Sequence, residues 1–279
     1  MVGIARYAVI GNPVSHSQSP FIHTEFARQT GIALRYEKQS TSLEHFAQVV
    51  HDFFTQSGCG LNITVPFKQA AYELAHTLTL RAQAAGAVNT LKYEHGTIYA
   101  DNTDGVGLIR DIQNNLAYNL RGKKICLLGA GGAARGVLLP LLACCPAAVF
   151  VANRTASKAV QLVETFAMHF SSHVASVDLS AGDVSQIPTG IDILISASSG
   201  SLQNVMPAIA PHAWPREFVY DMVYGAQPSA LLQCAQTKGI RVADGLGMLV
   251  EQAAESFFFW HGVQVRTPPV LAALRKKLK

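Results

Sequence analysis

The residues of this chain that most clearly predict a chemistry form a glycine-rich turn, Gly129-Ala130-Gly131-Gly132-Ala133, directly after the apolar residues 125–128. Gly129 permits a tight turn. Gly131 lets the backbone approach a pyrophosphate, which the N–H groups and the dipole of a following helix would bind. A second apolar run at residues 148–152 returns as the next strand. This context favours a dinucleotide site over a plain glycine turn in an α/β core.

The residues after that second strand bear on the choice of dinucleotide. A fold that prefers NAD usually carries Asp or Glu here, which accepts hydrogen bonds from the ribose 2′-hydroxyl. This chain has Asn153-Arg154-Thr155 instead, with Lys158 one helical turn further on. Because a cation and small polar donors suit a 2′-phosphate, the sequence predicts NADP. The alternative interpretation is that Arg154 is a surface residue in a strand-to-helix loop.

A second set of polar residues lies in the first hundred or so positions. Ser17 and Ser19 offer two hydroxyls between a strand and a helix, where open α/β sheets bind ligands. They can hold a carboxylate, or Ser19 can cap the helix with Ser17 as part of the loop. Lys68 follows another strand end, and Asp104 precedes a helix. Taken alone, these two are more often a solvated lysine and a helix cap.

Alternating strands and helices must position these residues. Strands are predicted at residues 6–10, 33–36, 61–65, 88–91 and 97–100, the last two joined by a turn at His95-Gly96. Helices are predicted at residues 19–31, 43–58 and from Pro66 onward, and then at 106–116. After the glycine turn, buried strands are predicted at 191–196 and 218–221, and helices at 248–260 and 270–277. This alternation predicts parallel sheets with right-handed crossovers.

Composition narrows the class of protein. The chain has 279 residues, of which 49% are hydrophobic and 14% charged, as in a compact globular protein. Its net charge of +4 is too small to predict a nucleic-acid binder. Residues 136–152 lack charge but contain two prolines and divide into a helix and a strand, so no membrane segment is predicted.

The cysteines and the chain's first residues bear on location and assembly. The five cysteines form no CxxC pair, which indicates reduced, cytoplasmic usage without a metal site. The N-terminus reaches Gly11-Asn12-Pro13 too soon for the apolar region of a signal peptide. No long heptad pattern is present, so we expect a monomer or a weak homodimer.

Eight segments, in order along nearly the whole chain, resemble the shikimate dehydrogenase family. They are Gly11-Asn12-Pro13 with His16-Ser17-Gln18-Ser19-Pro20; Asn62 through Lys68; Ala85-Gly86-Ala87-Val88-Asn89-Thr90; Asp101-Asn102-Thr103-Asp104-Gly105-Val106-Gly107; Gly129 through Gly136; Asn153-Arg154-Thr155; Tyr220-Asp221-Met222-Val223-Tyr224; and Ala243-Asp244-Gly245-Leu246-Gly247-Met248-Leu249-Val250.

The resemblance implies an NADP-dependent oxidoreductase of the shikimate pathway, which serves aromatic amino acid biosynthesis. Its reaction is the reversible, NADPH-dependent reduction of 3-dehydroshikimate to shikimate. The fold class implied is α/β, with an N-terminal α/β substrate domain and a Rossmann-type, doubly wound parallel-sheet NADP domain. The substrate domain is expected to be discontinuous, comprising residues 1–104 and 245–279, and the NADP domain to comprise residues 105–244.

The resemblance also implies roles for individual residues. Lys68 and Asp104 match the catalytic pair, and Ser17 and Ser19 match the residues that bind the substrate carboxylate. The residues that match those holding the ring hydroxyls of the substrate are Thr64, Lys68, Asn89, Asp104 and Gln252. Tyr224 matches a tyrosine that also lies at the substrate. The NADP-binding residues implied are Gly129, Ala130, Gly131, Gly132, Ala133, Asn153, Arg154, Thr155, Lys158, Ser198, Met222, Gly245 and Met248. No metal is implied.

The chemistry of a lysine–aspartate pair suits hydride transfer to a carbonyl carbon. Charge develops on the oxygen, which a positioned ammonium can stabilise and protonate, while a carboxylate orients the ammonium. The chain departs from its relatives at Lys158, where arginine is common, and at Ser196 and Ser198, where asparagine and threonine are usual. We expect no catalytic role for His16, and rather a structural hydrogen bond.

Two other functions are compatible with the same fold. One is a quinate/shikimate dehydrogenase with relaxed cofactor use, against which the absence of an acidic residue at Asn153-Arg154 argues. The other is a non-catalytic NADP-binding regulator, since fold does not fix function. The presence of both Lys68 and Asp104 argues against that alternative.

Overall fold

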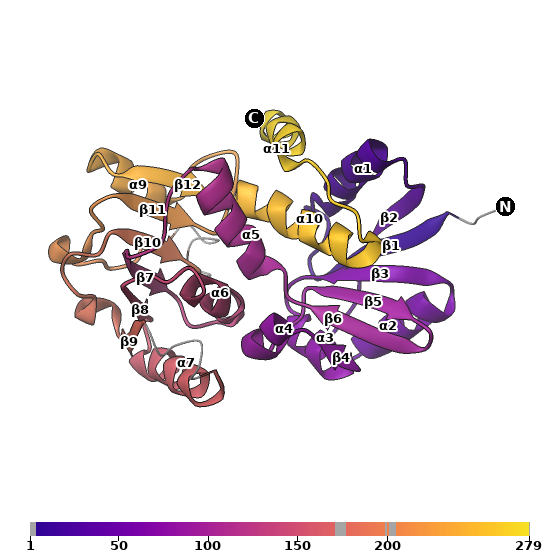
Figure 1. Ribbon diagram of the computed structural model, residues 1–279, viewed down its shortest axis with the longest axis horizontal. Helices are drawn as coiled ribbons and strands as arrows, with labels where there is room; N and C mark the ends of the chain where they lie inside the picture. Colours follow the sequence, from indigo (N-terminus) through magenta and orange to yellow (C-terminus); the bar gives the residue numbers. More distant parts are fainter. Residues whose placement is uncertain (1–3, 171–176, 199, 201–204, 279) are drawn as a thin grey trace.

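The molecule contains two six-stranded sheets, one in each half (Figure 1). The structure is a computed structural model that describes residues 4–170, 177–198, 200 and 205–278. The first sheet has the strand order β2-β1-β3-β5-β6-β4, and the second has the order β12-β11-β10-β7-β8-β9. Among the helices of these described residues, none combines the length and the apolar character that a bilayer-spanning segment needs.

The first sheet is mixed rather than wholly parallel. Its strands are β1 (Ala5–Gly11), β2 (Leu34–Ser40), β3 (Gly58–Ile63), β4 (Thr77–Leu78), β5 (Thr90–Glu94) and β6 (Thr97–Asp101). β1 pairs in parallel with β2 and β3, whereas β5 is antiparallel to both β3 and β6. The reason is the predicted two-residue turn at His95 and Gly96, which reverses the chain between β5 and β6.

The strand predicted at residues 61–65 ends two residues early, at Ile63. Pro66 has no N–H to give to a neighbouring strand, and the Phe67 N–H bonds back to the Thr64 carbonyl at 2.9 Å. The chain therefore turns out of the sheet at Thr64. The turn leads directly into α3 (Lys68–Leu74).

The second sheet is parallel throughout, as predicted. Its strands are β7 (Lys124–Leu128), β8 (Ala148–Ala152), β9 (Asp178–Gly182), β10 (Ile193–Ser196), β11 (Phe218–Asp221) and β12 (Arg241–Asp244). The strand order reverses between β7 and β10. Such a switch point is where doubly wound sheets bind ligands, just beyond the carboxyl ends of their strands.

Helices cover both sheets. They are α1 (Ser19–Thr30), α2 (Phe46–Thr55), α3, α4 (Leu80–Ala85), α5 (Asp104–Arg110), α6 (Gly132–Leu142), α7 (Ala156–His169), α9 (Ala230–Thr237), α10 (Leu246–His261) and α11 (Thr267–Lys277). The helix predicted at 106–116 is α5 followed by a π-helical turn, Asp111–Asn115. β4, α4, β9, α9 and β12 were not predicted from the sequence.

The two ends of the chain share one hydrophobic core. Ile22 and Phe26 of α1 are buried against Val250 and Phe257 of α10 and Val270 of α11. In Figure 1, α10 runs from the second sheet toward the first, with α11 near α1. The C-terminal helices therefore pack on the N-terminal half, although more than a hundred residues of the second sheet separate them in sequence.

Candidate active site

One cavity of about 320 Å³ contains every residue predicted to bind substrate. Most of its wall comes from turns at the carboxyl ends of strands in the first sheet, and the rest from the β11 and β12 ends of the second sheet and from α10. The predicted residues that line it are Ser17, Ser19, Thr64, Lys68, Asn89, Asp104, Tyr224 and Gln252. β1, β3 and β6 end at this edge of the first sheet and the antiparallel β5 begins there, which is why side chains so distant in sequence meet here.

Lys68 and Asp104 form an ion pair in this cavity. Each is the first residue of a helix, α3 and α5 respectively, and Lys68 Nζ lies 2.5 Å from Asp104 Oδ2. The lysine side chain is 26% exposed and the aspartate side chain 11% exposed, so the pair faces the cavity from a mostly buried position. The Lys68 carbonyl also accepts the Val88 N–H at 2.8 Å, which ties α3 to the chain segment that precedes Asn89.

The second oxygen of Asp104 is held by Asn89. The Thr103 backbone N–H donates to Asn89 Oδ1 at 2.9 Å, and a backbone N–H can only donate. This contact fixes which end of the amide is oxygen. The Asn89 Nδ2 group therefore faces Asp104 Oδ1, at 2.8 Å, and also lies 3.2 Å from Gln252 Oε1. Both carboxylate oxygens thus have defined donors.

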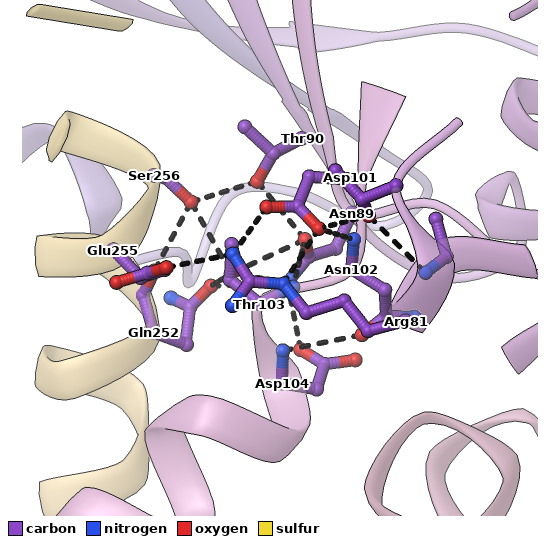
Figure 2. A network of polar contacts seen from close by, with 12 residues as sticks. Arg81, Asn89, Thr90, Asp101, Asn102, Thr103, Asp104, Gln252, Glu255 and Ser256 are labelled. Atoms are coloured by element: carbon purple, nitrogen blue, oxygen red, sulfur yellow. Dashed lines mark hydrogen bonds and ion pairs between the residues drawn. The ribbon is translucent and has the colours of Figure 1, made fainter. Parts of the chain in front are cut away.

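A buried polar network lies behind these residues (Figure 2). Asn62 donates to Thr90 Oγ1 at 3.2 Å and to Ser256 Oγ at 3.1 Å, and its own Oδ1 accepts from Tyr36 at 2.7 Å. Ser256 lies on α10, so the network joins α10 to β3 and β5. Buried polar groups that are mutually satisfied in this way hold a site rigid.

Ser17 and Ser19 present their hydroxyls to one another at the other end of the cavity. The two Oγ atoms are 3.1 Å apart, and the Ser19 N–H donates to Ser17 Oγ at 3.3 Å. The expectation that Ser19 caps α1 is wrong, because α1 begins at Ser19 itself and Gln18 occupies the cap position without a side-chain bond. Ser17 Oγ, which lies outside the helix, therefore accepts the first N–H of α1.

Tyr224 and Gln252 complete the wall. Burial raises the pKa of the Tyr224 phenol above its ordinary value, so this hydroxyl remains a neutral donor. Gln252 Nε2 donates to the Leu249 carbonyl at 2.9 Å, which turns Oε1 toward Asn89 and Thr103. The residues of the first sheet and those of α10 thus share one hydrogen-bonded wall.

The predicted cofactor residues follow the carboxyl ends of strands in the second sheet. Gly129 has φ +120° and passes so close to Ala197 that a Cβ would lie 3.0 Å from the Ala197 carbonyl carbon. A side chain is excluded at this position on both counts. The Gly129 N–H also bonds to the Ala152 carbonyl at 2.7 Å, so the glycine turn lies next to the start of the Asn153 loop.

The glycine turn has the form that a phosphate site requires. Gly131, Gly132 and Ala133 are exposed, and a Cβ at either glycine would meet no atom within 4 Å. α6 begins at Gly132, and its cap residue Gly131 makes no side-chain hydrogen bond. The N–H groups of the first turn are therefore available to an anion, and the helix dipole favours one there.

The loop after β8 is exposed and carries cations without a carboxylate. Arg154, Thr155 and Lys158 are exposed, and Asn153 Nδ2 bonds to the Thr155 carbonyl at 2.9 Å. Thr155 occupies the cap position of α7 and makes no side-chain bond there. This is the environment predicted for a 2′-phosphate.

The remaining cofactor candidates lead from the glycine turn to the cavity. Ser198 follows β10, with its Oγ 3.5 Å from the buried Ser196 Oγ. Met222, Gly245 and Met248 line the cavity itself. The predicted cofactor residues thus include an exposed glycine turn and loop in the second half of the molecule, and residues in the wall of the cavity that contains Lys68.

A glycine, Gly105, brings the segment that carries Asp104 close to α6. A Cβ at Gly105 would lie 2.4 Å from Pro140 Cγ and 2.6 Å from the Gly136 carbonyl oxygen, both on α6. α5 and α6 can therefore meet only because residue 105 has no side chain. Asp104 is the residue immediately before this contact.

Several site residues were not singled out from the sequence. Asn62 lines the cavity, and Arg81 and Asp101 lie behind it, but an asparagine in a strand or an arginine in a short helix carries no periodic signal. His16 also lines the cavity. It is exposed, and its carbonyl rather than its ring accepts a hydrogen bond, from Gln18. All five cysteines are free.

Comparison with known proteins gives a consistent result. Three family models match: the shikimate dehydrogenase substrate binding domain at residues 9–91, shikimate/quinate 5-dehydrogenase at 111–209, and the shikimate 5′-dehydrogenase C-terminal domain at 245–275. The chain is 52% identical over 281 residues to a shikimate dehydrogenase (NADP+) of Cupriavidus taiwanensis, with 98% of this chain and 94% of that protein covered.

Solved structures agree over almost the whole length. An Ael1 enzyme from Pseudomonas putida superposes with a TM-score of 0.90 at 41% identity, covering 97% of this chain and 98% of that one. A shikimate 5-dehydrogenase from Thermus thermophilus, in complex with NADP(H) and shikimate, superposes with a TM-score of 0.86 at 30% identity, covering 98% of this chain and 100% of that one.

Proposed function

This chain belongs to the shikimate dehydrogenase family, and we propose that its cavity holds 3-dehydroshikimate or shikimate against the Lys68–Asp104 pair. The reaction is the reversible, NADPH-dependent reduction of 3-dehydroshikimate to shikimate. We divide the chain accordingly into a substrate domain, residues 1–104 and 245–279, and an NADP domain, residues 105–244. The shared core of α1, α10 and α11 supports that division.

The substrate carboxylate binds at the Ser17–Ser19 end of the cavity. Two hydroxyls 3.1 Å apart can each donate to one carboxylate oxygen. Charged acceptors make such bonds stronger than those between neutral groups. The ring then extends toward Lys68, with its hydroxyls facing Thr64, Asn89, Asp104, Gln252 and Tyr224, which all line the same space.

Lys68 and Asp104 handle the proton. NADPH, when bound, supplies the hydride to the carbonyl carbon of the substrate. Lys68 Nζ stabilises the charge that develops on the carbonyl oxygen and donates a proton to it. Asp104 keeps the ammonium directed at the cavity and accepts from a ring hydroxyl, while Asn89 prevents the carboxylate from rotating away. In the oxidation of shikimate, Lys68 accepts the proton back.

The cofactor is held by three groups of residues. Gly129, Ala130, Gly131, Gly132 and Ala133 receive the pyrophosphate, and Asn153, Arg154, Thr155 and Lys158 receive the 2′-phosphate of NADP. Ser198, Met222, Gly245 and Met248 lie on the side toward the cavity and bound the nicotinamide. The exposed turn and its uncapped helix fit a diphosphate, which supports this assignment.

The observation that carries the function is the meeting of the lysine–aspartate pair with the serine pair in one cavity. The test is absorbance at 340 nm on mixing the protein with shikimate or quinate and NADP or NAD. We expect reduction of NADP with shikimate to be by far the most efficient combination. Equal rates with quinate or with NAD would favour a relaxed quinate/shikimate dehydrogenase, and no reduction with any pair would favour a non-catalytic regulator.

Location and assembly follow as proposals of their own. Five free cysteines suit a reducing compartment, which supports the cytoplasm. We propose a monomer or a weak homodimer, because the residues of one chain suffice to form the wall of the cavity. Light scattering coupled to size-exclusion chromatography would show the mass in solution.

A further inference from the structure

Arg81 does not line the cavity, but it forms an ion pair with the segment that carries Asp104 (Figure 2). It is the second residue of α4. Its guanidinium forms a two-pronged ion pair with Asp101 at the end of β6: Nε to Oδ1 at 2.7 Å, and Nη2 to Oδ2. The same Nη2 also donates to Glu255 Oε1 on α10, at 2.7 Å. One cation therefore bridges three elements.

Asp101 depends on this cation. Its side chain is wholly buried and accepts from Thr79 Oγ1 at 2.6 Å as well as from Arg81. A buried carboxylate is tolerated only when its charge and its lone pairs are matched. Burial by itself would lower the pKa of Arg81, but the hydrogen bonds and charges of Asp101 and Glu255 raise it above its ordinary value, so the cation persists.

Asp101 in turn shapes the turn that ends at Asp104. Its Oδ1 accepts the Asn102 N–H at 2.7 Å, and Asn102 Oδ1 accepts the Asp104 N–H at 3.2 Å. The Asp101 carbonyl accepts the Asn89 N–H at 3.0 Å. Asp104 and its partner Asn89 are therefore both oriented from the residue that Arg81 holds.

Arg81 also fixes the position of α10, through its ion pair with Glu255. The second oxygen of Glu255 pairs with Arg110 at the end of α5, at 2.7 Å. Glu255 lies one helical turn after Gln252, on a neighbouring stretch of the helix surface. Fixing Glu255 therefore fixes the rotation of α10 that presents Gln252 to the cavity.

We propose that Arg81 is a positioning residue of this active site, which sets the Asp104 carboxylate through Asp101 and the Gln252 amide through Glu255. It touches neither the substrate nor the cofactor. The inference rests on the proposed role of Lys68 and Asp104. It adds a residue through which their geometry is maintained.

A lysine at position 81 separates geometry from charge. Lysine keeps a positive charge beside the buried Asp101, so the compensation of that charge survives. It lacks the planar fork that makes two parallel bonds to a carboxylate and a third to Glu255. A loss of orientation without a loss of folding is therefore the expected consequence.

The experiment compares Arg81→Lys with Arg6→Lys and with the parent. Arg6 serves as the control because it is a partly exposed arginine of the same half of the molecule, on β1 (35% exposed against 23% for Arg81), and donates to the Gln56 carbonyl, away from the cavity. For Arg81→Lys we expect thermal unfolding and the NADP Kd to match the control. We expect kcat to fall about ten- to a hundredfold, as for a reacting group that is misplaced by about an ångström.

Two further readouts separate positioning from stability. The isotope effect on kcat with deuterated NADPH is expected to rise in Arg81→Lys, because the chemical step is the one that slows. In Arg81→Ala, added guanidinium ions at non-denaturing concentration are expected to recover part of kcat. A folded Arg81→Lys with the parent's kcat would overturn the inference, as would a loss of stability that accounts for the whole loss of rate. A parent without shikimate-dependent NADP reduction would instead overturn the proposed function.

Discussion

At the scale of single residues, hydrogen bonds hold the side chains of the site in defined orientations. The Thr103 N–H fixes the Asn89 amide, and that amide and Lys68 each hold one oxygen of Asp104. The hydroxyls of Ser17 and Ser19 lie beside one another, and neither residue occupies the cap position of α1. Pre-oriented groups of this kind lower the cost of reorganisation during the reaction.

The serine pair yields the first prediction. Ser17→Ala and Ser19→Ala are each expected to raise the KM for shikimate and to leave the NADP Kd unchanged. A lost hydrogen bond to a charged group costs about 1.5–3 kcal/mol, which is roughly ten- to 150-fold in binding. Since Ser19 is not a cap, its variant is also expected to melt at the parent's temperature. Steady-state kinetics and thermal unfolding check both points, and an unchanged KM in both variants would refute the carboxylate assignment.

Cofactor choice gives the second prediction at this scale. Arg154→Ala removes the exposed guanidinium beside the cap of α7, and only NADP has the 2′-phosphate that this guanidinium is proposed to contact. We expect kcat/KM to fall at least about tenfold with NADP, or roughly 1.4 kcal/mol, and to change little with NAD. Asn153→Asp is expected to shift preference further, by repelling the phosphate and offering acceptors to a free 2′-hydroxyl. Equal losses with both cofactors would mean that Arg154 supports the fold or the pyrophosphate instead.

At the scale of elements, close helix contacts carry the site. α5 meets α6 at Gly105 and Gly136, and this contact places Asp104 beside the helix of the glycine turn. α5 also meets α10, where a Cβ at Gly107 would lie 2.7 Å from Gln252 Cβ. The backbone spacing of three helices thus determines how the cavity that contains Lys68 lies relative to the glycine turn.

Gly105→Ala is expected to disturb that spacing. The added methyl would lie 2.6 Å from a backbone oxygen, which cannot swing aside as a side chain can. Overpacking of this kind costs about 1–3 kcal/mol, and we expect kcat to fall as well because Asp104 is the neighbouring residue. Gly132→Ala is the control, since a Cβ there meets nothing within 4 Å. Denaturant unfolding gives the free energy of unfolding of both variants. Equal values would show that α5 and α6 can move apart without loss of stability.

Much of this arrangement was predictable from the sequence. The glycine turn, the parallel second sheet and the β5–β6 hairpin follow from apolar runs and turn residues, and the eight segments identified the cavity residues together. β4 has only two residues and α4 only six, too short for a periodic pattern to mark either. Arg81 was missed for that reason. Its pairing with Asp101 and Glu255 could not be predicted either, because it depends on a fold that brings α4, β6 and α10 together.

At the scale of the whole molecule, the two ends of the chain close around a buried histidine. His23 of α1 is fully buried, stacks on Tyr36 at 4.5 Å between ring centroids, and lies 5.1 Å from the ring of Trp260 of α10. Among the described residues, neither of its ring nitrogens has a hydrogen-bond partner. Burial lowers the pKa of His23 to about 3, against an ordinary value of 6.5.

Because His23 is buried in its neutral form, the free energy of unfolding is expected to fall as the pH is lowered. His23 takes up a proton near pH 6.5 in the unfolded chain, but only near pH 3 in the folded one. The contribution of neutral His23 to the free energy of unfolding is therefore complete above pH 6.5 and is lost as the pH falls toward 3. The slope is at most about 1.4 kcal/mol per pH unit. Burial also lowers the pKa of His261 nearby, so His23→Phe serves to separate the two. Urea unfolding between pH 7.5 and 4.5 is expected to show a shallower decline in the variant, and parallel declines would contradict this account.

The proposed reaction depends on Lys68 as the group that moves the proton. The most direct test is kcat for shikimate oxidation by Lys68→Met, which keeps an unbranched side chain one atom shorter and removes the charge. The NADP Kd and the thermal unfolding temperature are measured on the same sample. We predict a fall in kcat of about 10²–10⁴ with an unchanged cofactor Kd, the usual contribution of a positioned acid–base group. A kcat within a few-fold of the parent would show that Lys68 is not the group that accepts the proton in this direction, and the mechanism would be wrong.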